Sequence, residues 1–296
     1  MSPVKEEAYV DRGTLWILQA GIFLTSFSLL TVEITLTRVL SVVLSYHYVF
    51  AVISLALLGL GAGSIFVHFL RPQIPRGDNR FGSLTLFASL FSLSIPFSVI
   101  LITRIAYIAS IRDNILFYSF SLIIPFFFAG ILLAEVFRMF PTISSKIYGA
   151  DLIGAAAGSL AVILILNVLG GINTSFFLGL TASMAALLFA MPVLRKNVSE
   201  VRISIVAFLI IAGLLGANLT GSYLPDVPIG MNPAKQIYKT LHTPSFEGKI
   251  IETRWSAFGR SDLVGFGNAA DNKPETMAIY IDGTAGSYMY RFNGDF

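Results

Sequence analysis

A series of long apolar stretches, followed by a change to water-soluble sequence, is the feature that most constrains this chain. Almost no charge interrupts the stretches between about residues 14 and 220, whereas residues 223–296 are rich in turn-forming and strand-forming residues. A helix that crosses the hydrocarbon core needs about 20 mostly apolar residues, and this region provides that length repeatedly. Only 12% of the residues are charged, against about 25% in soluble proteins. The sequence therefore predicts a multi-pass protein of the cell membrane, with the lipid bilayer as its first partner.

The apolar region divides into seven expected spans. Lipid offers no partner for backbone groups, so each span should be a helix. The short connection from Gly170 to Asn173 predicts a tight antiparallel hairpin between the fifth and sixth spans. The expected fold is mainly α, with a polytopic bundle of about seven helices in residues 1–222. The spans lie near residues 14–36, 46–70, 82–104, 114–138, 150–170, 173–194 and 202–220.

The soluble tail, residues 223–296, is expected to form a short helix and a small antiparallel β meander. The helix is predicted near residues 234–241, and the strands are predicted near 249–256, 261–266, 277–281 and 287–292. Gly267-Asn268 and Asp282-Gly283 have the composition of turns between strands. Because so few strands are marginal alone, the sheet should pack on another part of the protein.

Basic residues in the short loops predict the orientation. Loops on the cytoplasmic side carry an excess of Lys and Arg, and most of the basic residues fall on the side of the N-terminus, at positions 5, 12, 71, 76, 80, 138, 146, 195, 196 and 202. Only Arg38, Arg104 and Arg112 fall on the other side. We assign the net charge of +3 to this asymmetry and expect no nucleic-acid partner. Seven full spans would place the tail outside the cell. We expect instead a cytoplasmic tail and one segment near residues 38–47 that does not cross fully.

Three ionisable residues of the membrane region are candidate site residues. Glu33, Arg38 and Asp151 lie near span ends, and intramembrane charges usually face the bundle interior or a partner. We expect them to meet inside the bundle, in which case Asp151→Leu should destabilise the protein more than Lys235→Ala, because the loss of a buried partner leaves the other charge uncompensated. The alternatives are an interfacial role for Glu33 and Arg38, whose side chains reach the headgroups, and helix capping by Asp151.

Other polar and small residues of the membrane region have structural interpretations. Glu135 and Arg138 are three residues apart and should form an ion pair on one helix face. Gly59 and Gly63 are expected to pack against another helix, and so are Ala150, Gly154 and Gly158, which repeat every four residues. The chain has no Cys, and its three His residues are scattered. Since no second ligand lies near any His in the sequence, we expect no metal site. We also expect no cofactor and assign no catalytic residue, and the oligomeric state stays open.

The order of several motifs resembles the multi-pass membrane spermidine synthase-like family, and the resemblance covers nearly the whole chain. In the membrane region the motifs occupy residues 31–38, 46–48, 53–63, 125–130 and 148–155. In the tail they are the stretches Thr253–Asp262 and Ile279–Gly283. These tail stretches are similar to the strands that precede the aminopropyltransferase-like domain of that family.

The resemblance implies aminopropyl transfer from decarboxylated S-adenosylmethionine to putrescine on a methyltransferase-like α/β domain. Such a domain needs a glycine-rich turn that holds the nucleoside and acidic residues that bind the ribose and accept a proton. No such turn follows Phe266. We expect an inactive membrane portion whose catalytic domain is missing or is supplied by a partner chain. A transporter-like or ligand-binding protein with a polar site between helices, and a purely structural anchor, are the alternatives.

Overall fold

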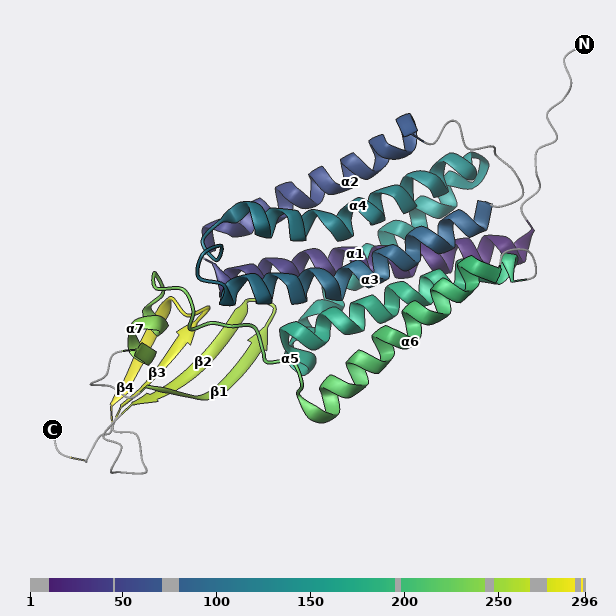
Figure 1. Cartoon of the computed structure of the whole chain (residues 1–296). Coiled ribbons are helices and arrows are strands. Elements are labelled where there is room, and N and C mark those ends of the chain that lie inside the picture. Colours follow the sequence, from purple (N-terminus) through teal and green to yellow (C-terminus); the bar gives the residue numbers. More distant parts are fainter. Residues whose placement is uncertain are drawn as a thin grey trace, which may run out of the picture.

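The computed structural model describes residues 11–44, 46–70, 80–194, 198–242, 248–266, 276–290 and 294, and the expected turn at Gly267-Asn268 lies outside them. It confirms a mainly helical fold followed by a four-stranded antiparallel sheet (Figure 1). Six helices in the described residues are long and apolar enough to cross a membrane. They are α1 (Arg12–Val43), α2 (Val49–Leu70), α3 (Arg80–Tyr107), α4 (Ile115–Met139), α5 (Ser144–Ala190) and α6 (Val198–Gly221).

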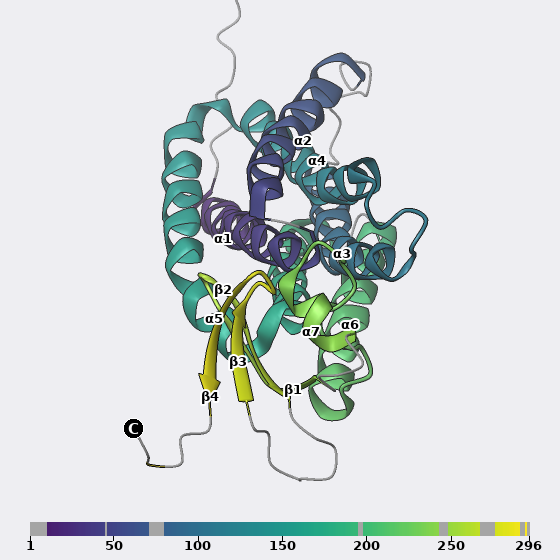
Figure 2. The same cartoon turned by 90° about the vertical axis from the view of Figure 1, so that its left-hand side faces the viewer.

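Helix α5 contains both the fifth and the sixth predicted span, because it folds back at Gly170. The backbone of Gly170 has φ 69° and ψ −178°, a conformation outside the helical region that glycine adopts at little cost. Before this turn, Gly154 and Gly158 follow Phe23 and Phe27 in the same chain direction. After it, Thr181 lies beside Ser28 and Phe189 lies beside Gly21, in the reverse direction. The two halves therefore form the predicted hairpin, which passes around one side of α1 (Figure 2).

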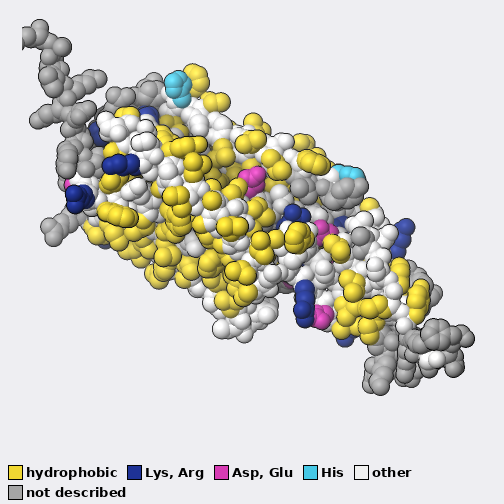
Figure 3. Space-filling model, turned by 180° about the vertical axis from the view of Figure 1, so that it is seen from behind, with side chains coloured by type: hydrophobic (Ala, Val, Ile, Leu, Met, Phe, Trp, Pro, Cys, Tyr) yellow, Lys and Arg dark blue, Asp and Glu magenta, His cyan; other side chains and the backbone are white. Residues whose placement is uncertain are grey.

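The outer surface of the bundle is apolar, as a lipid-facing surface must be. Large side chains are exposed on several helices, among them Phe50, Leu57, Leu160, Val168 and Leu209. Figure 3 shows hydrophobic side chains covering much of the bundle, with basic side chains gathered at its far end and around its junction with the sheet. This distribution matches a bilayer around the bundle and water at both ends.

Small residues let helices approach closely at the two places that the sequence predicts. Between α2 and α4, a Cβ atom at Gly59 would lie 2.8 Å from Cβ of Phe126, and one at Gly63 would overlap the carbonyl oxygen of Phe127. Between α1 and α5, Cβ atoms at Gly154 and Gly158 would overlap backbone oxygens of α1, and Ala150 on the same face is buried. Close backbone contact of this kind is a main source of attraction between helices in lipid.

Replacing Gly63 by Ala should therefore destabilise the bundle, by about 1–3 kcal/mol if the cost resembles that of an overpacked core. Gly61→Ala is the matched control, since a Cβ there meets no atom within 4 Å and alanine favours a helix more than glycine does. Thermal unfolding of both variants in detergent, followed by circular dichroism, measures the difference. Equal midpoints for the two variants would contradict the close-contact interpretation.

The tail forms α7 (Gln236–His242) and the strands β1 (Lys249–Ser256), β2 (Gly259–Phe266), β3 (Thr276–Ile281) and β4 (Ala285–Tyr290), in the order β1-β2-β3-β4. Each strand pairs antiparallel with the next, for example through Arg254 with Ser261 and Leu263 with Ile279. The buried side chains Trp255, Val264 and Tyr280 belong to the same hydrophobic cluster as Leu36 and Val39 of α1. The sheet thus completes its core against the bundle, as its small size requires.

The chain passes from one end of the bundle to the other seven times: once in each of the five other long helices and twice in α5. Consequently α1 begins at the end far from the sheet (Figure 1). The structure gives no support to a segment near residues 38–47 that fails to cross. In the described residues there, α1 ends at Val43, a single 3₁₀ turn covers Tyr46–Tyr48, and α2 starts at Val49. The reason is that the break in the helix falls at the end of the bundle and not at membrane depth.

The end where α1 begins also carries Arg80, Arg138, Lys146 and Arg202, so the positive-inside rule predicts that this end is cytoplasmic. The sheet should then lie on the opposite, non-cytoplasmic side. A single Cys introduced at Ser287 on exposed β4 should react with an impermeant maleimide in intact cells. A Cys at Ser199, near the start of α6, should react only after permeabilisation. The reverse pattern would show that the sheet is cytoplasmic.

Candidate functional site

The junction between bundle and sheet holds three of the buried charged side chains of the described residues, Lys235, Arg260 and Asp262, and Lys235 contacts both parts. This residue precedes α7 and is 1% exposed. Its Nζ donates hydrogen bonds to the carbonyl oxygens of Ser41, Val42 and Asp282, each at 2.6 Å. The last carbonyls of a helix have no partner within the helix, so the ammonium group satisfies two groups at the end of α1 and joins them to the sheet. Its positive charge also suits the negative end of the helix dipole.

The turn between β3 and β4 supplies the sheet's half of this contact. Asp282 and Gly283 have φ of 49° and 72°, and Thr284 N–H donates to the Ile281 carbonyl at 3.1 Å. These positive φ angles are the conformation that Asp-Gly favours in a hairpin turn. The Asp282 carboxylate accepts from Ser41 Oγ at 2.6 Å and from the Arg260 N–H at 2.8 Å. One aspartate therefore connects the end of α1 to two neighbouring strands.

A second buried cluster surrounds Arg260 on β2. Its guanidinium donates Nε and Nη2 to Asp262 Oδ1 at 3.0 and 2.8 Å, and it also donates to the carbonyl of Val227. Asp226 Oδ2 lies 3.3 Å from Arg260 Nη1 and accepts from Trp255 Nε1 at 2.9 Å. Asp262 is fully buried, and its Oδ2 has no hydrogen-bond partner among the described residues. Such clusters fix geometry because leaving one member unpaired is costly.

Trp255 joins this cluster to the turn of α5. The indole ring lies against Gly170 and Gly171, where a Cβ atom would come within 3.3 and 2.9 Å of it. Nearby, Asn218 of α6 donates to Asn173 Oδ1 at 2.7 Å and accepts from the Leu224 N–H at 2.8 Å. The linker after α6 is therefore held by side chains from two helices.

The three candidate residues of the membrane region do not converge. Arg38 Nη1 donates to the Phe258 carbonyl at 3.2 Å, at the sheet end of α1. Asp151 accepts a hydrogen bond from Ser26 Oγ at 2.5 Å. Ser26 lies on α1 about two turns before Glu33, so Asp151 and Glu33 are at different depths. Glu33 is half-buried and makes no ion pair or side-chain hydrogen bond with any described residue. Asp151 is not a cap either, because α5 begins seven residues earlier, at Ser144.

Sequence reasoning identified one ionic contact correctly and missed the central one. Arg138 Nη2 lies 2.7 Å from Glu135 Oε2, and the Glu135 side chain is fully buried, so the expected ion pair is present. Lys235, in contrast, was expected to be an unimportant lysine of the tail, whose replacement would cost less stability than that of Asp151. A lysine in a turn-rich segment is normally solvated, and nothing nearby in the sequence signals its partners almost 200 residues away.

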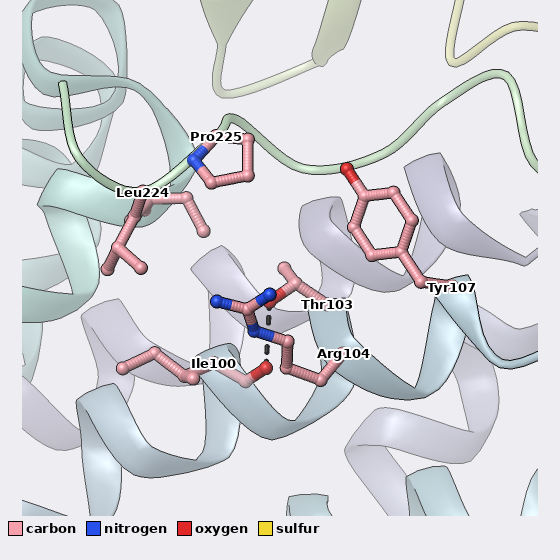
Figure 4. Close-up of a pocket in the computed structure, with 7 residues that line it drawn as sticks. Ile100, Thr103, Arg104, Tyr107, Leu224 and Pro225 are labelled. Atoms are coloured by element: carbon pink, nitrogen blue, oxygen red, sulfur yellow. Dashed lines mark hydrogen bonds between the residues drawn. The ribbon is translucent and has the colours of Figure 1, made fainter.

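A small pocket opens at the same end of the bundle, between the end of α3, the turn of α5 and the linker after α6. Figure 4 shows the Arg104 guanidinium lying over Thr103 near Leu224, while the Tyr107 hydroxyl points toward the linker. The pocket is lined by Ile100, Thr103, Arg104, Tyr107, Ile172, Leu224 and Pro225. Thr103 Oγ1 donates to the Ile100 carbonyl at 2.8 Å. Arginine is thus the only charged group among the lining residues.

The described residues contain no group of three or more His, Cys, Asp or Glu side chains that could hold a metal ion. Comparison with known proteins adds no relative: no protein-family model, no curated protein and no solved structure matches this chain. The function must therefore be argued from the fold and the junction.

The stability of the junction should depend on pH through Lys235. Burial lowers the pKa of Lys235 from 10.5 to about 8, although Asp282 opposes part of this shift. Between pH 8 and pH 10.5 the folded protein binds fewer protons than the unfolded protein. The free energy of unfolding should therefore rise as pH increases from about 8. The cost of burying the charge is fully present below pH 8. Thermal midpoints of the wild type should rise relative to those of Lys235→Met between pH 7.5 and about 9.5.

Lys239→Met is the control for this measurement. It removes a lysine of α7, four residues after Lys235, and retains Lys235 itself, so it should keep the wild-type dependence on pH. A wild-type midpoint that follows that of Lys235→Met at every pH would show that Lys235 does not titrate in this range.

Proposed function

We propose that this chain is the membrane part of a spermidine synthase-like protein. In this proposal the bundle is an anchor, and the sheet is a platform on which an aminopropyltransferase-like domain packs. That domain belongs to the same protein or to a partner chain. The motifs of the membrane region and tail support the family, and the observation that carries the platform role is the outer face of the sheet.

The part of this outer face on β3 and β4 is largely apolar and open, while the β1 part carries the exposed Glu252–Arg254 ion pair. Ile279, Ile281 and Met289 are 38%, 51% and 44% exposed, respectively, and alternate residues of a strand share a face. On the opposite face, Ala278 and Tyr280 are fully buried. A soluble sheet that exposes neighbouring apolar side chains marks an interaction surface. Because the junction fixes the sheet to the bundle, a domain bound here would have a defined position relative to the membrane.

The described part of the tail supports anchoring better than catalysis. It is an antiparallel sheet with one short helix, whereas a nucleoside site of the expected type needs a glycine-rich turn between a strand and a helix. The transporter-like alternative loses its basis, since Glu33, Arg38 and Asp151 each have different surroundings.

The purified chain alone should give no saturable heat with decarboxylated S-adenosylmethionine in calorimetry, because the described residues offer no turn to hold the nucleoside. Saturable binding at micromolar concentration would contradict the anchoring proposal.

The platform itself can be tested with an aminopropyltransferase-like domain added in trans. Binding to the purified chain should weaken about tenfold or more for Ile281→Asp, because a charge would be buried without a partner. Thr284→Asp, on the adjacent turn, is the control and should bind like the wild type. No binding to the wild type, or equal binding to both variants, would contradict the platform role.

A further inference from the structure

The pocket at the end of α3 contains a cation, Arg104, that has no partner among the described residues. The Arg104 side chain is exposed and makes no hydrogen bond or ion pair with any described residue. The other arginines near this end are engaged. Arg38 binds the Phe258 carbonyl, Arg112 Nη1 donates to the Met231 carbonyl at 2.6 Å, and Arg260 pairs with Asp262. The charge of Arg104 is therefore available to a ligand that reaches the pocket.

The position of Arg104 on α3 indicates where such a ligand comes from. Phe97 lies seven residues before Arg104, so the two side chains share one face of the helix. Phe97 is 54% exposed in the apolar part of the bundle, which places this face toward lipid. The same stripe thus runs from the hydrocarbon region to a guanidinium at the end of the helix, in the region that headgroups occupy.

The remaining walls suit an amphipathic ligand. Ile100, Ile172 and Leu224 are apolar, and Tyr107 brings a hydroxyl group to the mouth of the pocket (Figure 4). Tyrosine is enriched at the membrane interface because its ring prefers the apolar side and its hydroxyl prefers water. Leu224 and Pro225 belong to the linker that Asn218 holds in place, so this wall is fixed by the fold.

We infer that this pocket binds the phosphate group of a membrane phospholipid. The planar guanidinium of Arg104 matches phosphate oxygens with two parallel hydrogen bonds, and the Tyr107 hydroxyl donates a further one. The acyl chains lie along the face that contains Phe97. Inorganic phosphate shares the headgroup chemistry but lacks the chains, so the two sources can be separated by experiment.

The test measures lipid bound to the delipidated chain in detergent, by native mass spectrometry during titration with phosphatidylglycerol. Affinity should fall about tenfold in Arg104→Gln, which removes one charge-assisted pair. Leu224→Trp, which fills the pocket and keeps the arginine, should reduce binding as well. Arg202→Gln is the matched control, because Arg202 is an exposed arginine near the other end of a long helix, and its affinity should not change.

Two further arms identify the group that is recognised. Diacylglycerol, which has the chains without the phosphate, should bind the wild type and Arg104→Gln equally weakly. Inorganic phosphate should not displace the lipid at millimolar concentration. Equal lipid affinity in the wild type and Arg104→Gln, or equal binding of phosphatidylglycerol and diacylglycerol, would overturn the proposal. Displacement by inorganic phosphate would make the pocket a site for a free anion and would overturn the lipid assignment.

Discussion

The close approach of α1 to both halves of α5 is the interaction on which the other parts of this structure depend. Gly154 and Gly158 bring the first half against α1 backbone, and the Ser28–Thr181 hydrogen bond of 2.7 Å joins the second half to it. Lipid provides no hydrophobic force between helices, so such contacts must supply the attraction. They are possible only because the chain reverses at Gly170, whose φ of 69° suits glycine.

The same reversal prepares the surface on which the sheet docks. Trp255 packs on Gly170 and Gly171, while the end of α1 presents carbonyl groups to Lys235. The tail therefore contacts two features of the bundle at once, the end of α1 and the turn within α5. Its buried charges are satisfied mainly by backbone groups and by one another, which gives a fixed orientation in place of an open reactive site.

Along its long axis the protein presents three different surfaces. The far end carries an excess of basic residues, the middle exposes apolar side chains, and the other end carries a folded sheet whose strands β3 and β4 expose apolar side chains. The anchor role that we propose would need this division. Arg104, which has no partner among the described residues, lies beside the linker at the sheet end of α3, where the apolar surface of the bundle gives way to polar side chains.

The sequence by itself determined the parts of the protein whose causes are local. Lipid forces apolar stretches into helices, alternation and turn residues define the strands, and Asp282-Gly283 specifies its hairpin turn. The tertiary structure alone decided which charges meet. Glu33, Arg38 and Asp151 lie near span ends in the sequence, yet helix rotation and depth give them separate surroundings. Lys235 looks like a surface lysine, yet the docked sheet brings it to the carbonyls of Ser41 and Val42. Periodicity reports the environment of a segment, whereas a partner distant in the chain is fixed only when the segments pack.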